Sequence, residues 1–240
     1  MGSSDALGPT APDAVTVRSN SRAIARTVKV ARERPKQWAP PEGLTPQQIR
    51  AVIGAAESPR DRLLLRTLWA TGARVSEVLA LRAMDVHADH LVLPNRKNPS
   101  RPVKRAFLGG SDQDLPGALL LLQKAARVAD DEPLFVSRQR GRDGRRKALT
   151  RQMVWTVVRR ASERAGVRVL ALRDSAAGPK GDPAPVHPHL FRHAKVRQVV
   201  RQTRSLPLAQ KLAGWSKLQM AYLTIGDDEA REMLARVVDE

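Results

Sequence analysis

The chain has 240 residues, of which 42 are basic and 24 acidic, so its formal net charge at pH 7 is +18. This excess makes a polyanion the expected partner, because each neutralised phosphate releases condensed counterions; a basic protein without such a partner is the alternative. Cysteine is absent, which excludes disulfides and thiolate zinc sites. The sequence shows no membrane-length apolar run and no secretory signal, so we expect the protein in the cytoplasm or nucleoid. Its length predicts one folded domain.

The first 43 residues are expected to lie outside that domain. Residues 1–14 are rich in Gly, Ser, Pro, Ala and Asp, a composition typical of disorder. Residues 20–34 place five cations around small apolar side chains, which fits either a short basic helix that orders on DNA or a solvated basic arm. The prolines within 35–41 prevent a helix from continuing and predict a linker.

The residues from 44 onward predict a mainly helical domain. Thr45 and Pro46 suit the N-cap and first turn of a helix. Ser58-Pro59 ends that helix, and a second, leucine-rich helix follows over 60–71. Further helices are expected at 75–81, 115–129, 150–166, 191–203, 206–213 and 227–238.

Two segments between these helices favour strands. Residues 90–94 and 101–108 predict a strand pair, joined by a polar turn that contains Lys97. Residues 173–187, rich in Gly and Pro, predict a long loop of the functional or mobile kind. The fold class expected is therefore α+β, mainly α with a small antiparallel β-sheet.

A phosphate-binding signature appears in Thr71–Glu77. Arg74 follows a helix-ending glycine, and its guanidinium presents a rigid fork of donors that matches two phosphate oxygens. Glu77, three residues later, is placed to hold that fork. An ordinary surface ion pair at i,i+3 spacing is the alternative.

A second signature lies in His187–His193. If a helix begins near Pro188, His189 and Arg192 share one face and can donate to one phosphate. His189 and His193 also have helical i,i+4 spacing, which leaves a metal site as an alternative, although no cysteine or acidic third ligand stands nearby.

A third signature is Leu212-Ala213-Gly214-Trp215 followed by Tyr222, the one tyrosine of the chain. The indole N–H of Trp215 is a single strong donor on a large apolar body; a packed core aromatic is the alternative. The phenol of Tyr222 is a candidate nucleophile.

Together and in this order, these segments resemble the tyrosine recombinase (phage integrase) family over most of residues 44–240. The first signature is similar to the family's first arginine box, the second to its His-x-x-Arg box, and the third to its Leu-Gly-His/Trp box. Leu134-Phe135-Val136, with the basic turn after it, resembles the segment before the family's central helix. The resemblance implies a tyrosine-recombinase catalytic-domain architecture over 44–240.

The resemblance also implies roles. Arg74 and Arg192 would bind the non-bridging oxygens of the scissile phosphate, with His189 assisting proton transfer and Trp215 donating to the phosphate. Tyr222 would attack phosphorus and form a 3′-phosphotyrosine.

A lysine would protonate the departing 5′ oxygen; Lys97 fits best and Lys104 is the second choice. Glu77 would support Arg74. No cofactor or metal is implied. The implied partners are double-stranded DNA and, on that DNA, further copies of the chain.

The sequence departs from the family pattern at the tyrosine. Tyr222 lies seven residues after Trp215, whereas the family usually places its tyrosine nine residues on, where this chain has Thr224. On a continuous helix a two-residue shift rotates a side chain by roughly 200°. The sequence from Tyr222 to Glu229 nevertheless resembles the segment that begins at the family's tyrosine, which favours Tyr222 with a shortened loop before it.

Alternatives to a recombinase remain open. A recombinase-derived DNA-binding protein with little cleavage is the principal one, and a relaxing enzyme of the type IB topoisomerase kind is another. A metal-dependent nuclease lacks the carboxylate cluster that it needs. About 43 residues before the domain are too few for the helical DNA-clamping module that family members commonly carry there.

Overall fold

A computed structural model describes residues 43–95, 102–170 and 183–213 of the chain. The chain divides into two units, Met1–Ala39 and Pro40–Glu240, and every described residue belongs to the second. Several predicted features lie outside the described residues. They are the basic arm and linker, Lys97, most of the 173–187 loop, and the segment that contains Trp215, Tyr222, Thr224 and the 227–238 helix. The boundary at residue 44 stays a prediction.

The first helix begins where its cap predicts, and the second begins at Pro59, one residue before the expected 60. Helix α2 (Pro46–Gly54) starts with a capping box, in which the Thr45 hydroxyl accepts the Gln48 N–H at 3.2 Å and the Gln48 side chain accepts the Thr45 N–H at 2.9 Å. Helix α3 (Pro59–Thr71) is capped by Ser58.

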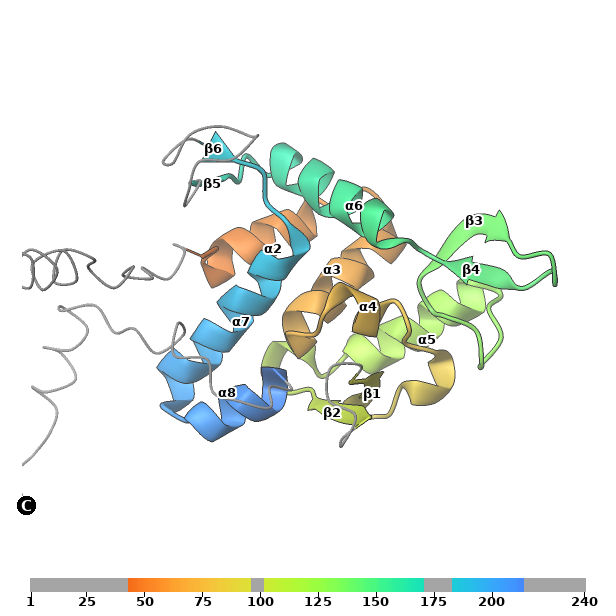
Figure 1. The fold of residues 1–240 in the computed structure, drawn as a ribbon, viewed down its shortest axis with the longest axis horizontal. Helices are drawn as coiled ribbons and strands as arrows, with labels where there is room; N and C mark the ends of the chain where they lie inside the picture. The colour runs from red at the N-terminus through yellow and green to blue at the C-terminus, as the bar shows by residue number, and fades with distance from the viewer. Residues whose placement is uncertain (1–42, 96–101, 171–182, 214–240) are drawn as a thin grey trace, which may run out of the picture. The chain divides into compact units, whose positions relative to one another are not determined.

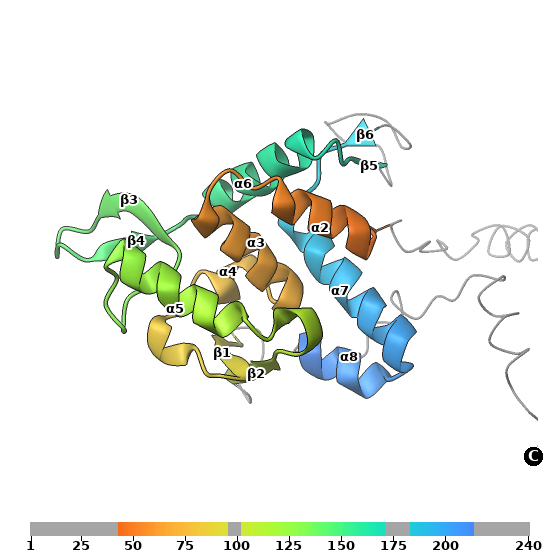
Figure 2. The ribbon, with the colours of Figure 1, turned by 180° about the vertical axis from the view of Figure 1, so that it is seen from behind.

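Helix α3 lies in the middle of the domain and packs against α2, α5 and α7 (Figures 1 and 2). The helices after α3 are α4 (Val75–Val78), α5 (Leu115–Ala126), α6 (Arg151–Arg164), α7 (Pro188–Thr203) and α8 (Leu206–Ala213), with 3-10 turns at Ala83–Asp85 (η1) and Gly110–Asp112 (η2). Helix α4 is shorter than the predicted 75–81, because the chain leaves the helix so that the Leu81 carbonyl accepts the Leu134 N–H at 2.8 Å.

The described residues form three two-stranded antiparallel sheets rather than the single sheet predicted. The predicted pair is β1 (His90–Pro94) with β2 (Val103–Phe107), in a register that places Leu93 opposite Lys104. The additional pairs are β3 (Val136–Arg140) with β4 (Arg146–Ala148), and β5 (Val169–Leu170) with β6 (Pro183–Ala184). The mainly α fold class with small antiparallel sheets is confirmed.

The apolar core has a large part and a small part. The large cluster draws on α2 to α7 and on β1, and contains the leucines of α3 together with Phe135 and Phe191. A separate small cluster, formed by Val196 of α7 with Ala209 and Ala213 of α8, holds α8 against α7. The buried apolar side chains that α8 contributes to this contact are therefore small. None of the helices within 43–95, 102–170 and 183–213 is long and apolar enough to cross a membrane.

Candidate functional site

Arg74 stands at the junction of α3 and α4. Gly72 ends α3 in the left-handed conformation, with φ of +56°, and Arg74 is the extended N-cap residue of α4. The Arg74 guanidinium donates to Glu77 Oε1 at 2.7 Å, and the Arg74 backbone N–H donates to Glu77 Oε2 at 3.0 Å. The Glu77 side chain is 1% exposed. This burial rules out the ordinary surface ion pair and supports a fixed orientation for Arg74.

Lys104 approaches the same carboxylate from β2. Its Nζ lies 3.0 Å from Glu77 Oε2 and donates to the carbonyl of Leu212 in α8 at 3.4 Å. Burial raises the pKa of Glu77, but the charge of Lys104 and the hydrogen bonds from Arg74 outweigh it, so the net pKa is lowered. Glu77 is therefore an anion held between two cations.

The pKa of Lys104 is lowered as well. Burial is the largest cause, Glu77 opposes it, and the positive charges of Arg192 and Arg74 lower the pKa further. Both arginines of the expected phosphate clamp therefore act on one ammonium group.

Arg192 reaches this region from α7 and is 2% exposed. Its Nη1 donates to the Gly72 carbonyl at 2.9 Å, and its Nη2 donates to the Ala213 carbonyl at 2.6 Å. The structure thus brings Arg74 and Arg192 together with Glu77 and Lys104; we call these four residues the charge cluster. Arg192 joins the cluster to the carboxyl end of α3 and to the last described turn of α8.

The histidines of α7 lie beside the charge cluster. His189 is exposed, and its ring meets that of His193 edge-to-face with centroids 4.3 Å apart. Burial, followed by the charges of His189, His187, Arg197 and Arg192, lowers the pKa of His193 to about 3. His193 is therefore neutral near pH 7. Within the described residues no group of three or more ligating side chains is placed to hold a metal ion, so the metal alternative gains no third ligand there.

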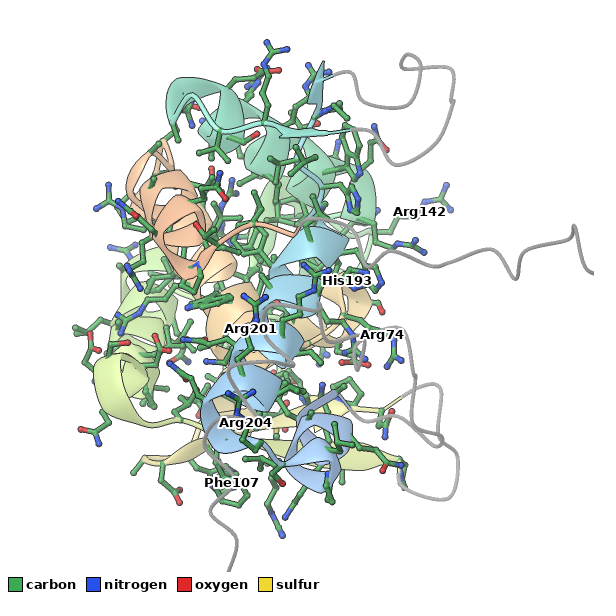
Figure 3. The ribbon with its side chains drawn as sticks, turned by 90° about the vertical axis from the view of Figure 1, so that its left-hand side faces the viewer. Arg74, Phe107, Arg142, His193, Arg201 and Arg204 are labelled. Carbon is green, nitrogen blue, oxygen red and sulfur yellow. The ribbon has the colours of Figure 1, made fainter. Side chains whose placement is uncertain are left out.

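A basic hairpin extends from the domain at β3 and β4 (Figure 1). Its exposed arginines, which we call the hairpin arginines, are Arg138, Arg140, Arg142 and Arg145. Arg140 is fixed by donating to the Gly144 carbonyl at 2.7 Å. In Figure 3, Arg142, His193 and Arg74 all reach toward the same side of the domain. This face therefore combines the charge cluster with a protruding positive arm.

The sequence predicted Arg74, His189 and Arg192 as site residues and held Lys104 as second choice. It noted the basic turn after Val136 but not the strands on either side of it, and it missed the backbone partners. The sequence contained one signal for the hairpin, the alternation of arginine with other residues around Gly141 and Gly144. Lys97, Trp215 and Tyr222 lie outside the described residues and keep the roles that the resemblance implies as predictions.

Residues 42–224 match the sequence model of the phage integrase family. The chain belongs to this family. Among curated relatives, the family member XerD of Xanthomonas axonopodis pv. citri, a tyrosine recombinase, is 30% identical over 195 residues, which covers 76% of this chain and 57% of the relative.

Solved structures of the phage integrase family share this fold. The XerA recombinase superposes with a TM-score of 0.61 at 21% identity, covering 85% of this chain and 65% of its own. A lambda integrase tetramer bound to a Holliday junction superposes with a TM-score of 0.55 at 21% identity, covering 85% of this chain and 56% of its own. The chain spans about 60% of the length of the curated relatives: 61% of XerA of Pyrococcus horikoshii and 57% of XerD of Xanthomonas axonopodis pv. citri.

Proposed function

We propose that this chain is the catalytic part of a tyrosine-type site-specific DNA recombinase, which cleaves and rejoins double-stranded DNA through a 3′-phosphotyrosine intermediate on Tyr222. The observation that supports this most is the meeting of Arg74 and Arg192 around Glu77 and Lys104. Two guanidinium groups held by buried partners form a preorganised site for the charge that develops on a phosphate in the transition state.

In the proposed reaction the phenol oxygen of Tyr222 attacks phosphorus while Arg74 and Arg192 bind the non-bridging oxygens. The bond from phosphorus to the 5′ oxygen breaks, and Lys97 gives that oxygen a proton. His189 assists proton transfer at the tyrosine, and Trp215 donates its indole N–H to the phosphate. Attack by a 5′-hydroxyl on the phosphotyrosine reverses these steps, so no external energy source is needed.

The partner in this proposal is double-stranded DNA. The net charge of +18 and the hairpin arginines favour a duplex that lies along the face shared with Arg74. Self-association on DNA is proposed from the family membership together with the tetrameric assembly of lambda integrase. We place the activity in the cytoplasm, in contact with chromosomal DNA.

One observation favours a second candidate function, a DNA-binding protein with little or no cleavage. Tyr222 lies two residues earlier after Trp215 than the family spacing, and on a helix such a shift would turn its hydroxyl away from phosphorus. The same basic face would serve this protein, so DNA affinity does not separate the two functions.

Covalent trapping separates them. A duplex with a nick beside a randomised segment loses its short cleaved end, so that a protein–DNA adduct accumulates and can be selected. The recombinase proposal expects an adduct that Tyr222→Phe abolishes and Thr224→Ala leaves intact. An adduct lost in Thr224→Ala but kept in Tyr222→Phe would reassign the nucleophile. The absence of any adduct, with duplex binding retained, would favour the DNA-binding protein.

A further inference from the structure

Lys104 occupies an unusual place in its strand. It is the buried residue of β2, between the exposed Val103 and Arg105, and its side chain is only 8% exposed. An inward-facing strand position ordinarily takes an apolar side chain, because a buried ammonium loses its hydration. A lysine at this position therefore needs partners that compensate for its burial, and it has them in Glu77 and Leu212.

We propose that Lys104 is a positioning residue, which ties the last described turn of α8 to Glu77 and Arg74, and that it is not the proton donor to the leaving oxygen. The inference rests on the proposed recombinase function and refines it. It gives Lys104, the second choice of the sequence, a different role, and leaves proton donation to Lys97, the first choice.

The geometry of Lys104 supports this assignment. A proton donor must come within about 2.6–3.2 Å of the leaving oxygen, whereas Nζ of Lys104 already lies 3.0 Å from a carboxylate that is 1% exposed. Movement of Nζ toward DNA would break a buried ion pair and leave the Glu77 carboxylate buried without this cation. The lowered pKa of Lys104 would by itself suit an acid; the bonds to Glu77 and Leu212 decide against that role.

Helix α8 depends on such bonds. Its apolar attachment is the small cluster with Val196, to which α8 contributes the buried side chains of Ala209 and Ala213 and the partly buried Leu212. Its last described turn is held by Lys104 at the Leu212 carbonyl and by Arg192 at the Ala213 carbonyl. Trp215 follows Ala213 by two residues and Tyr222 by nine. In the proposed reaction both residues act at the phosphate, so the position in which α8 ends matters to both.

A change of leaving group tests the proposal directly. In a duplex with a sulfur atom in place of the bridging 5′ oxygen, the leaving group is a thiolate; a thiol has a pKa near 8.5 and departs without a donated proton. A variant that has lost the proton donor should therefore regain its rate on the sulfur duplex. A variant in which the catalytic groups are misplaced should stay slow on it. The measurement is the single-turnover rate of covalent adduct formation on the oxygen and sulfur duplexes.

We expect Lys104→Met to slow adduct formation about 100-fold on both duplexes, the scale of a misplacement of about 1 Å. Lys104→Arg should restore the oxygen rate to within about tenfold, because the guanidinium keeps the charge yet does not give up a proton. Lys97→Met should be slow with oxygen and restored with sulfur. Lys124→Met, at an exposed lysine of α5, is the control and should be unchanged.

Restoration of Lys104→Met by the sulfur duplex would overturn the proposal, and so would an oxygen rate that stays 100-fold slow in a folded Lys104→Arg protein. If the wild-type protein forms no adduct on either duplex, the recombinase function has failed, and hydrogen exchange in residues 206–213 decides the inference. Faster exchange in Lys104→Met, but not in Lys104→Arg or Lys124→Met, would support positioning. Unchanged exchange would reject it.

Discussion

Substituting alanine for Gly72 tests how closely α3 and α8 meet. A Cβ atom at this position would lie 2.8 Å from Cδ2 of Leu212, a distance that real Cβ atoms do not adopt. Gly72 also has a φ of +56°, which L-residues with a side chain seldom take. The substitution therefore combines backbone strain with a steric contact at the turn that leads to Arg74.

The two contributions have different sizes. Left-handed backbone costs a residue with a Cβ about 1–2 kcal/mol. The contact is with the end of a flexible side chain, so Leu212 can relieve it by leaving its preferred rotamer, at about 0.5–1.5 kcal/mol. We expect Gly72→Ala to lower the free energy of unfolding by about 2–3 kcal/mol.

Urea denaturation with two control glycines separates these contributions. Gly166 has a φ of +64° and nothing within 4 Å of the added Cβ, so Gly166→Ala should show the strain alone, about 1–2 kcal/mol. Gly117 lies within α5 without either constraint, so Gly117→Ala should stabilise the domain by about 0.5–1 kcal/mol.

A double-mutant cycle with Leu212→Ala completes the test. Removal of the clashing atom should recover the steric part, giving a favourable coupling of about 1 kcal/mol between the two substitutions. The reasoning is refuted if Gly72→Ala costs no more than Gly166→Ala, or if the two substitutions are additive. Either result would mean that α8 does not rest against Gly72.

Three further outcomes follow from the described residues. Changing the hairpin arginines to glutamine should reduce the slope of log K for duplex binding against log salt concentration by about 0.9 per lost phosphate contact. The same change at four exposed cations elsewhere should have a smaller effect; these are Arg50, Arg62, Lys124 and Arg168. Glu77→Gln should destabilise the domain by about 3–5 kcal/mol, because Lys104 stays buried without its anion. Glu57→Gln, at an exposed ion pair, should cost at most about 1 kcal/mol, and urea denaturation measures both. The pKa of His193 is lowered to about 3 from an ordinary 6.5, so between these pH values the unfolded state binds more protons than the folded state. Stability should therefore fall as pH drops from about 6.5 toward 3. In a pH series of thermal melts, a dependence of Tm on pH that is no flatter in His193→Gln than in the wild type would contradict this.

Local chemistry explains which parts of the fold the sequence predicted. The start of α2 was predicted because Thr45 supplies a cap oxygen and a proline follows it. Ser58-Pro59 was read as a break between helices, and the cap that Ser58 gives to α3 was not recognised. Strands β1 and β2 were predicted because an apolar run at 90–94 and its partner at 101–108 flank a polar turn. In each case the information lies within a few adjacent residues.

The β3–β4 hairpin and the short α4 were not predicted, because their causes lie elsewhere in the chain. Only the first two residues of β3 are buried, so the strand carries no apolar alternation. Helix α4 stops early because Leu81 pairs with Leu134, more than fifty residues away. Neither effect leaves a periodic pattern in the local sequence.

The site divides in the same way. Arg74 and Arg192 were predicted from residue type and order, which reflect what a phosphate needs. The inward position of Lys104 and its bond to Leu212 could not be predicted, because they depend on the pairing of β2 with β1 and on the place of α8.

The charge cluster explains why these connections converge on Glu77. The charges that act on Lys104 are those of Glu77, Arg192 and Arg74, so the cluster combines one carboxylate with three cations. Such a cluster keeps a positive potential even though Glu77 is satisfied, and a phosphodiester carries the opposite charge. A second carboxylate would reduce the excess positive charge of the cluster and compete with DNA, whereas without Glu77 the two arginines and Lys104 would repel one another. A single buried glutamate thus holds the cations together and leaves their excess charge for the phosphate.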